Sequence, residues 1–69
     1  MKTIHKEYRV DKQKIGFIRF VFEGYDGIAN ATTIEAKEGH IRLSIAPDRI
    51  QTAMQIIEDL KKGCLFHEI

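Results

Sequence analysis

The chain has 69 residues, and its 11 lysines and arginines nearly balance 10 aspartates and glutamates, which leaves a formal net charge of +1. This charge lacks the basic excess typical of proteins that bind a phosphate backbone, so nucleic acid is disfavoured as a partner. The single cysteine, Cys64, excludes an intramolecular disulfide. A chain this short buries only about 60% of the surface that its unfolded form exposes. We therefore expect one domain over residues 1–69 that gains stability by self-association.

The N-terminal segment is charged where a secretory signal peptide needs an apolar core. No apolar run approaches the roughly 20 residues that a membrane-spanning helix requires. We therefore expect a cytoplasmic protein with no membrane partner.

The first predicted element is a strand over residues 3–10, in which bulky apolar side chains alternate with polar ones. Asp11 then suits a helix N-cap, and a helical repeat of apolar residues predicts a helix over residues 12–24. Residues 17–22 are also rich in β-forming side chains, but the interval from Asp11 to Gly24 is longer than a usual strand. The apolar residues at helical spacing are Ile15, Ile18, Phe22 and Tyr25.

Two aromatic residues of this helix, Phe17 and Phe20, lie beside its main apolar stripe. We expect a wide apolar face that packs on a sheet. The alternative is a helix that also contacts a partner.

Residues 28–36 are predicted as the second strand because they are rich in β-branched side chains. Gly27 and Gly39, on either side of this strand, suit turn positions with a positive φ. Residues 40–45 predict a third strand, in which apolar and polar side chains alternate most regularly. Its apolar side consists of Ile41, Leu43 and Ile45.

Pro47 suits the first turn of a second helix, which Gly63 ends. Residues 64–69 are then short enough for a final strand. The apolar residues that predict the buried stripe of the second helix are Ile50, Ala53, Met54, Ile57 and Leu60.

The resulting order is βαββαβ, which predicts an α+β, ferredoxin-like fold with two helices on one face of a four-stranded antiparallel sheet. In this topology the spatial order of the strands is fourth, first, third, second. The other face of the sheet is then left without helices.

Three segments carry a resemblance to a known family: Phe20-Val21-Phe22-Glu23-Gly24-Tyr25-Asp26-Gly27-Ile28-Ala29, Thr32-Thr33 and Ile45-Ala46-Pro47-Asp48. In these segments the chain resembles small bacterial proteins of the domain of unknown function 4911 family. The resemblance covers nearly the whole chain and supports the boundaries of the predicted elements. It implies no activity.

The same element order is similar to that of ACT-type regulatory modules, which often pair through their sheets around amino-acid ligands. Such modules usually carry a ligand-contacting glycine in the loop that enters the first helix. Residues 11–14 contain no glycine, so an amino-acid site of that kind is disfavoured.

The turn after the first helix breaks a local rule, because Glu23 and Asp26 place negative charge at the carbonyl end of the helix dipole. Acidic groups beside the phenol of Tyr25 and the amide of Asn30 can hold a cation or an amine. These four residues are therefore candidates for binding a small molecule. In the alternative, structural interpretation, Glu23 pairs with Arg19 and Asp26 forms an Asx turn.

No motif in the sequence indicates catalysis. Cys64 follows the end of the second helix and gains no helix N-terminus to activate it. Ser44 has no histidine or lysine at a spacing that implies contact, and no glycine-rich phosphate loop is present. We therefore expect no enzyme, no catalytic residue and no cofactor.

The helix-free face offers an RNA-binding alternative, because RRM-type domains of this topology stack bases on exposed aromatic side chains. The predicted outward positions of the two central strands carry no aromatic residue. Only Arg9 and Arg42 favour this alternative.

The three histidines, His5, His40 and His67, raise the question of a metal site. We expect the starts of the first and third strands to lie side by side, with the end of the fourth strand beside them. The imidazoles would then approach one end of the sheet, where neutral nitrogen ligands suit zinc or copper. No close-spaced ligand motif supports such a site, and we assign no metal.

We expect a small interaction or ligand-sensing module that acts as a homo-oligomer, most simply a dimer. An RNA-binding sheet surface and, less favoured, a small enzyme are the alternatives. Leu65 and Ile69 motivate self-association, because their positions in the last strand predict apolar side chains on the uncovered face.

Overall fold

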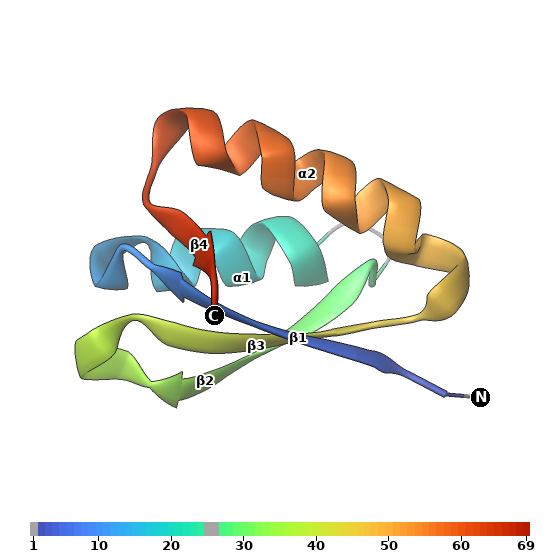
Figure 1. Cartoon of the computed structure of the whole chain (residues 1–69), viewed down its shortest axis with the longest axis horizontal. Coiled ribbons are helices and arrows are strands. Elements are labelled where there is room, and N and C mark those ends of the chain that lie inside the picture. The colour runs from blue at the N-terminus through green and yellow to red at the C-terminus, as the bar shows by residue number, and fades with distance from the viewer. Residues whose placement is uncertain (1, 25–26) are drawn as a thin grey trace.

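The computed structural model describes residues 2–24 and 27–69 of the chain. Its strands and helices follow the predicted order, and the α+β, ferredoxin-like architecture is confirmed (Figure 1). In chain order the elements are β1 (Ile4–Val10), α1 (Ile15–Glu23), β2 (Ala29–Glu35), β3 (His40–Ile45), α2 (Ile50–Gly63) and β4 (Phe66–Glu68). No helix in this described part is long and apolar enough to span a membrane.

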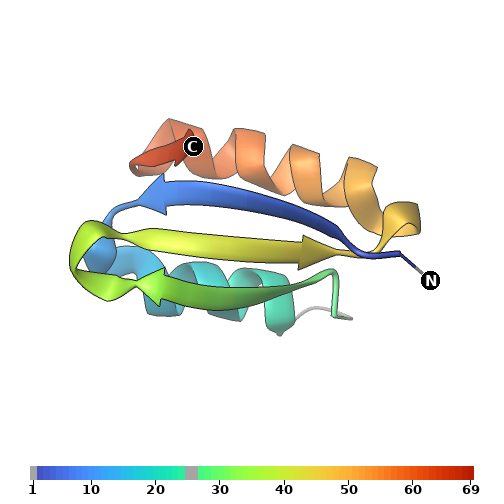
Figure 2. The same ribbon diagram turned by 60° about the horizontal axis from the view of Figure 1, so that its bottom comes forward.

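The four strands form one sheet in the order β2-β3-β1-β4, and every neighbouring pair is antiparallel. Both helices lie on the same side of the sheet, and β4 lies beside β1 at one edge (Figures 1 and 2). This is the predicted strand order, and it leaves β2 and β4 as the two edge strands.

The core lies between the sheet and the helices. On β3 the predicted alternation is confirmed, because the three apolar residues are fully buried while the polar residues between them are half-buried. From the helices, Ile18 and Phe22 of α1 and Ala53 and Ile57 of α2 reach the same core. The buried residues are Tyr8, Val10, Ile18, Phe22, Ile28, Ala29, Ala31, Ile41, Leu43, Ile45, Ala53, Ile57 and Phe66.

Short 3₁₀ turns lead into both helices, over Lys12–Lys14 and Pro47–Arg49. The predicted cap at Asp11 is confirmed, since its carboxylate accepts a hydrogen bond from the backbone N–H of Gln13 at 2.9 Å. The α-helix itself begins only at Ile15, three residues later than predicted.

The outer side of α1 corrects one expectation. Phe17 is 53% exposed and Phe20 is 69% exposed, so the expected wide apolar face that packs on the sheet was wrong. Residues 18 and 22 face the core, and Phe20, two residues from each, therefore points away from it. Phe17 instead lines a shallow hollow of about 250 Å³ between the two helices, beside Leu60 of α2 and Cys64, which follows that helix.

The aromatic rings of Tyr8 and Phe66 connect β4 to the core. Their centroids lie 4.8 Å apart at an interplanar angle of 52°, and both side chains are buried. The Tyr8 hydroxyl has no hydrogen-bond partner among the residues that the structure describes, and its burial raises the pKa of the phenol to about 12. This packing holds the short strand β4 against β1 from the helix side.

Candidate functional site

The helix-free side of the sheet is a polar surface built from three cross-strand rows. The strand pairing places Asn30 beside Ser44 and Ser44 beside His5, and it places Thr32 beside Arg42 and Arg42 beside Glu7. The third row runs from Glu35 through His40 and Arg9 to His67. We call this surface the open face; its residues are His5, Glu7, Arg9, Asn30, Thr32, Glu35, His40, Arg42, Ser44 and His67.

Glu7 is the centre of the hydrogen bonds on the open face. Its Oε1 lies 2.6 Å from Nε2 of His40, and its Oε2 accepts hydrogen bonds from Nε and Nη2 of Arg42 at 3.3 and 3.1 Å. These hydrogen bonds, first that with His40 and then those with Arg42, hold the pKa of the Glu7 carboxyl below its ordinary value of 4.5. The carboxylate thereby fixes the orientation of both side chains.

This network predicts a specific response to acid. Because the folded-state pKa of Glu7 is depressed, its contribution to stability is fully present above the unfolded-state pKa and is lost as the pH falls through the lowered value. The variant Glu7→Gln should therefore lose less stability than the parent between about pH 5 and pH 2. Urea midpoints measured across this range test the prediction, and equal acid sensitivity of the two proteins would contradict it.

Ser44 and His5 form a contact that sequence reasoning missed. They are direct cross-strand partners, and Nδ1 of His5 lies 3.1 Å from Oγ of Ser44. No spacing in the sequence implied this contact, because the two residues are 39 positions apart and only the register of β1 on β3 brings them together. Both side chains lie on the open face rather than in a cleft of the helix layer.

The expected approach of the three histidines is wrong for His5. Strands β1 and β3 are antiparallel, so their starts lie at opposite ends, and His5 pairs with Ser44 while His40 pairs with Arg9. His40 and His67 do share one end of the sheet, on either side of Arg9. Within residues 2–24 and 27–69, no group of three histidine, cysteine or acidic side chains is placed to hold a metal ion.

The residues predicted to bind a small molecule fall on two sides of the sheet. The Glu23 carboxylate, at the end of α1, accepts a hydrogen bond from the backbone N–H of Ala31 at 3.0 Å and lies 3.9 Å from Nε of Arg19. It thus satisfies a backbone amide of edge strand β2. Asn30 is exposed between two buried alanines and belongs to the open face. Residues 25 and 26 (Tyr25 and Asp26) lie outside the described part of the chain.

Strand β4 presents an edge with unpaired backbone groups. The carbonyl of Leu65 accepts a hydrogen bond from the N–H of Asp11 at 3.2 Å, and the N–H of Ile69 donates to the carbonyl of Glu7 at 3.0 Å. Backbone groups alternate in direction along an antiparallel strand. The N–H and C=O groups of Phe66 and Glu68 therefore point away from β1, toward the free edge.

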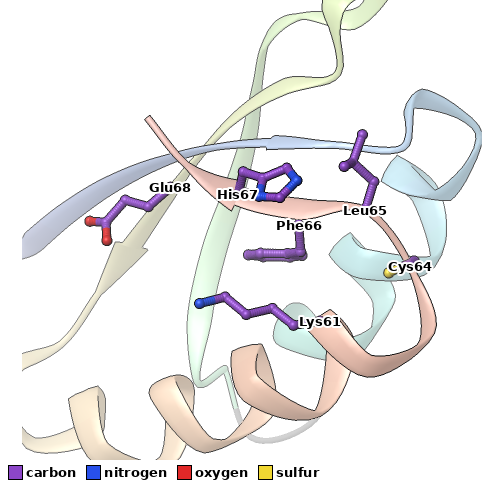
Figure 3. Close-up of a pocket in the computed structure, with 6 residues that line it drawn as sticks. All are labelled: Lys61, Cys64, Leu65, Phe66, His67 and Glu68. Atoms are coloured by element: carbon purple, nitrogen blue, oxygen red, sulfur yellow. The ribbon is translucent and has the colours of Figure 1, made fainter.

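Two apolar side chains accompany this edge. Leu65 is 46% exposed and Ile69 is 65% exposed, which confirms that neither side chain is buried in the core. Figure 3 shows Leu65 on the side of the strand away from α2, and Phe66 on the opposite side, toward Lys61 of α2. A hollow of about 360 Å³ lies between β4 and α2. Its lining consists of Lys61, Cys64, Leu65, Phe66, His67 and Glu68. We call these features together the β4 edge.

Comparison with known proteins identifies the family of the chain but no individual relative. Neither the curated proteins nor the solved structures contain a match to the chain. The family described as "Domain of unknown function (DUF4911)" matches residues 8–63, which include both helices and most of the sheet. This range is most of the sequence and confirms the resemblance to this family. The chain therefore belongs to the DUF4911 family.

Proposed function

We propose that the protein is a non-enzymatic interaction module that functions as a homodimer, in which two copies pair through their β4 strands. The observation that carries this proposal is the β4 edge, where the outward backbone groups of a short strand lie between two exposed apolar side chains. An exposed strand edge is a template for pairing with another strand. The occupant that we infer is the β4 strand of a second copy.

The backbone of β4 selects one antiparallel register for this pairing. When the two strands are centred on His67, Phe66 lies opposite Glu68 of the second copy, and the reverse pair forms by symmetry. All the outward N–H and C=O groups of the two strands then find partners, which gives four hydrogen bonds. If the register shifted by one hydrogen-bonded pair in either direction, either Phe66 or Glu68 would no longer lie opposite a β4 residue of the second copy.

The side chains of the β4 edge suit the same register. Leu65 lies opposite Ile69 of the second copy, so each exposed apolar side chain covers the other on the open face. Glu68 of the second copy lies opposite Phe66, beside the hollow that Lys61 lines. Lys61 now pairs with Glu58, and Glu68 pairs with Lys6, but both ion pairs are solvent-accessible, so exchanging them costs little.

The dimer would contain one continuous eight-stranded sheet with the two open faces side by side. This enlarged polar surface is where we infer that a ligand or partner binds. Glu23, Tyr25, Asp26 and Asn30 stay a second set of candidate binding residues; of those that the structure describes, Glu23 contacts β2 from the end of α1 and Asn30 lies on the open face. RNA is disfavoured as the ligand because none of the open-face residues is aromatic.

Sedimentation equilibrium tests the proposed dimer directly. We expect a species heavier than the 8.0 kDa monomer in the micromolar range, and we expect Leu65→Gln to raise the dimer dissociation constant at least about tenfold, because it removes an apolar cross-strand contact. Phe20→Gln is the matched control, since Phe20 is an even more exposed apolar residue on another element.

Two results would overturn the proposal. A protein that stays monomeric up to millimolar concentration does not function as a homodimer. A dimer that Phe20→Gln disrupts and Leu65→Gln does not is formed by the outer side of α1, and the β4 pairing is then wrong.

A further inference from the structure

The third row of the open face is incomplete in one copy of the chain. It runs from Glu35 on β2 through His40 on β3 and Arg9 on β1 to His67 on β4, where the sheet ends. In the dimer centred on His67, this row continues into the same residues of the second copy in reverse order. Any role for the complete row rests on the proposed dimer, because half of the row comes from each copy.

The geometry of the row follows from the backbone directions at β4. His67 pairs with Arg9 through its own backbone groups, so across the dimer axis it occupies a non-hydrogen-bonded pair. Cα atoms in such a pair are about 4.5 Å apart, and the side chains lie close together. The two Arg9 residues are separated by three strand spacings, or about 14 Å, with only the two His67 imidazoles between them.

Most carboxylates near the row already bind other groups. Glu7 is engaged by His40 and Arg42. Glu35, at the β2 end of the row beside His40, accepts a hydrogen bond from the backbone N–H of Lys37. Glu38 contacts Arg9 with a long Nη2 to Oε1 distance of 3.5 Å, and both side chains are more than half exposed. No carboxylate belongs to the row between one Arg9 and the other. The centre of the dimer therefore concentrates N–H donors and positive charge.

We infer that this shared row binds the phosphate group of a ligand at the dimer axis. Guanidinium and imidazole N–H groups are strong donors to phosphate oxygens, and arginine in particular matches their geometry. A metal ion fits this position poorly, because two imidazoles fall short of the four ligands that zinc takes. The two guanidinium groups would also repel a cation.

The test measures how phosphate changes dimerisation. A ligand that binds only the dimer lowers the apparent dimer dissociation constant by mass action. We expect inorganic phosphate to lower this constant about tenfold relative to chloride at equal ionic strength, measured by sedimentation equilibrium. His67→Gln and Arg9→Gln should each abolish the phosphate effect. His5→Gln, which changes a histidine in another row of the same face, should retain it.

The outcomes separate this inference from the proposed dimer. A dimer that forms in chloride and does not respond to phosphate overturns the phosphate site and leaves the β4 pairing intact. A response that His67→Gln and Arg9→Gln both retain places phosphate elsewhere and also overturns the site. A dimer that Zn²⁺ strengthens through His67, while phosphate has no effect, makes the row a metal site. Absence of a dimer in both salts overturns the proposed function, and the shared site with it.

Discussion

Gly39→Ala is expected to destabilise the fold by more than about 2 kcal/mol, because it combines a strained backbone with a direct clash. Gly39 has φ of 68° in the turn between β2 and β3, which confirms the predicted positive φ. A Cβ atom at this position would overlap the carbonyl oxygen of Val10. Neither group can move easily, since the N–H of Val10 donates to the carbonyl of Gly39 at 2.8 Å.

Gly27→Ala is the matched control for this variant. Gly27 also has a positive φ, of 60°, but a Cβ atom there meets no heavy atom of the non-neighbouring residues that the structure describes within 4 Å. We expect the free energy of unfolding to fall by about 1 kcal/mol, which is the cost of the positive φ alone. Urea unfolding of the two variants, at protein concentrations below the dimer dissociation constant, separates the cost of the backbone conformation from the cost of the clash. Equal losses in both variants would show that the close contact between Gly39 and Val10 is absent in solution.

Glu68→Pro is expected to abolish dimerisation, raising the dimer dissociation constant at least about a hundredfold, while the monomer stays folded. The N–H of Glu68 points to the free edge, and proline is tolerated at such positions because no intramolecular hydrogen bond is lost. In the dimer, each proline removes one donor and places its ring against the second strand. Sedimentation equilibrium measures the association, and thermal unfolding confirms that the monomer remains folded.

Glu68→Gln is the control that removes the charge and keeps the amide. It breaks the ion pair with Lys6, which is exposed and contributes little. We expect this variant to fold like the parent and to have a dimer dissociation constant within a few fold of the parent's. If Glu68→Pro dimerises as well as Glu68→Gln, the outward amide is not part of the interface.

The parts of the fold that sequence reasoning predicted are those that depend on local periodicity. The strict alternation of Ile41, Leu43 and Ile45 with polar residues leaves β3 one orientation. The cap at Asp11 and the turn at Gly39 follow from side-chain and backbone chemistry within a few residues. The order of these elements then restricts the topology to the one observed.

The errors arise where strand direction or register decides the contact. His5 and His40 were placed together because both begin a strand, although β1 and β3 run in opposite directions. The contact between His5 and Ser44 depends on the same register, which no local pattern reveals. The sequence did not predict the exposure of Phe20, because an apolar residue on a short helix can lie on its buried or its exposed side until the packing of the helix is known.

The candidate site was predictable only in part. The apolar character of Leu65 and Ile69 indicated self-association from the sequence. The direction of the backbone groups of Phe66 and Glu68 depends on how β4 pairs with β1, through contacts between residues more than fifty positions apart. That pairing, rather than composition, identifies the free edge and its register.

Amide hydrogen exchange at Phe66 and Glu68 tests the proposed interface most directly. When the protein concentration is raised through the dimer dissociation constant, exchange at both amides should slow at least about tenfold, because each then donates to the second copy. The amide of Ile69, which donates to Glu7 within one copy, should exchange at the same rate at every concentration. A dimer in which the amides of Phe66 and Glu68 continue to exchange as fast as in the monomer would contradict the β4 pairing.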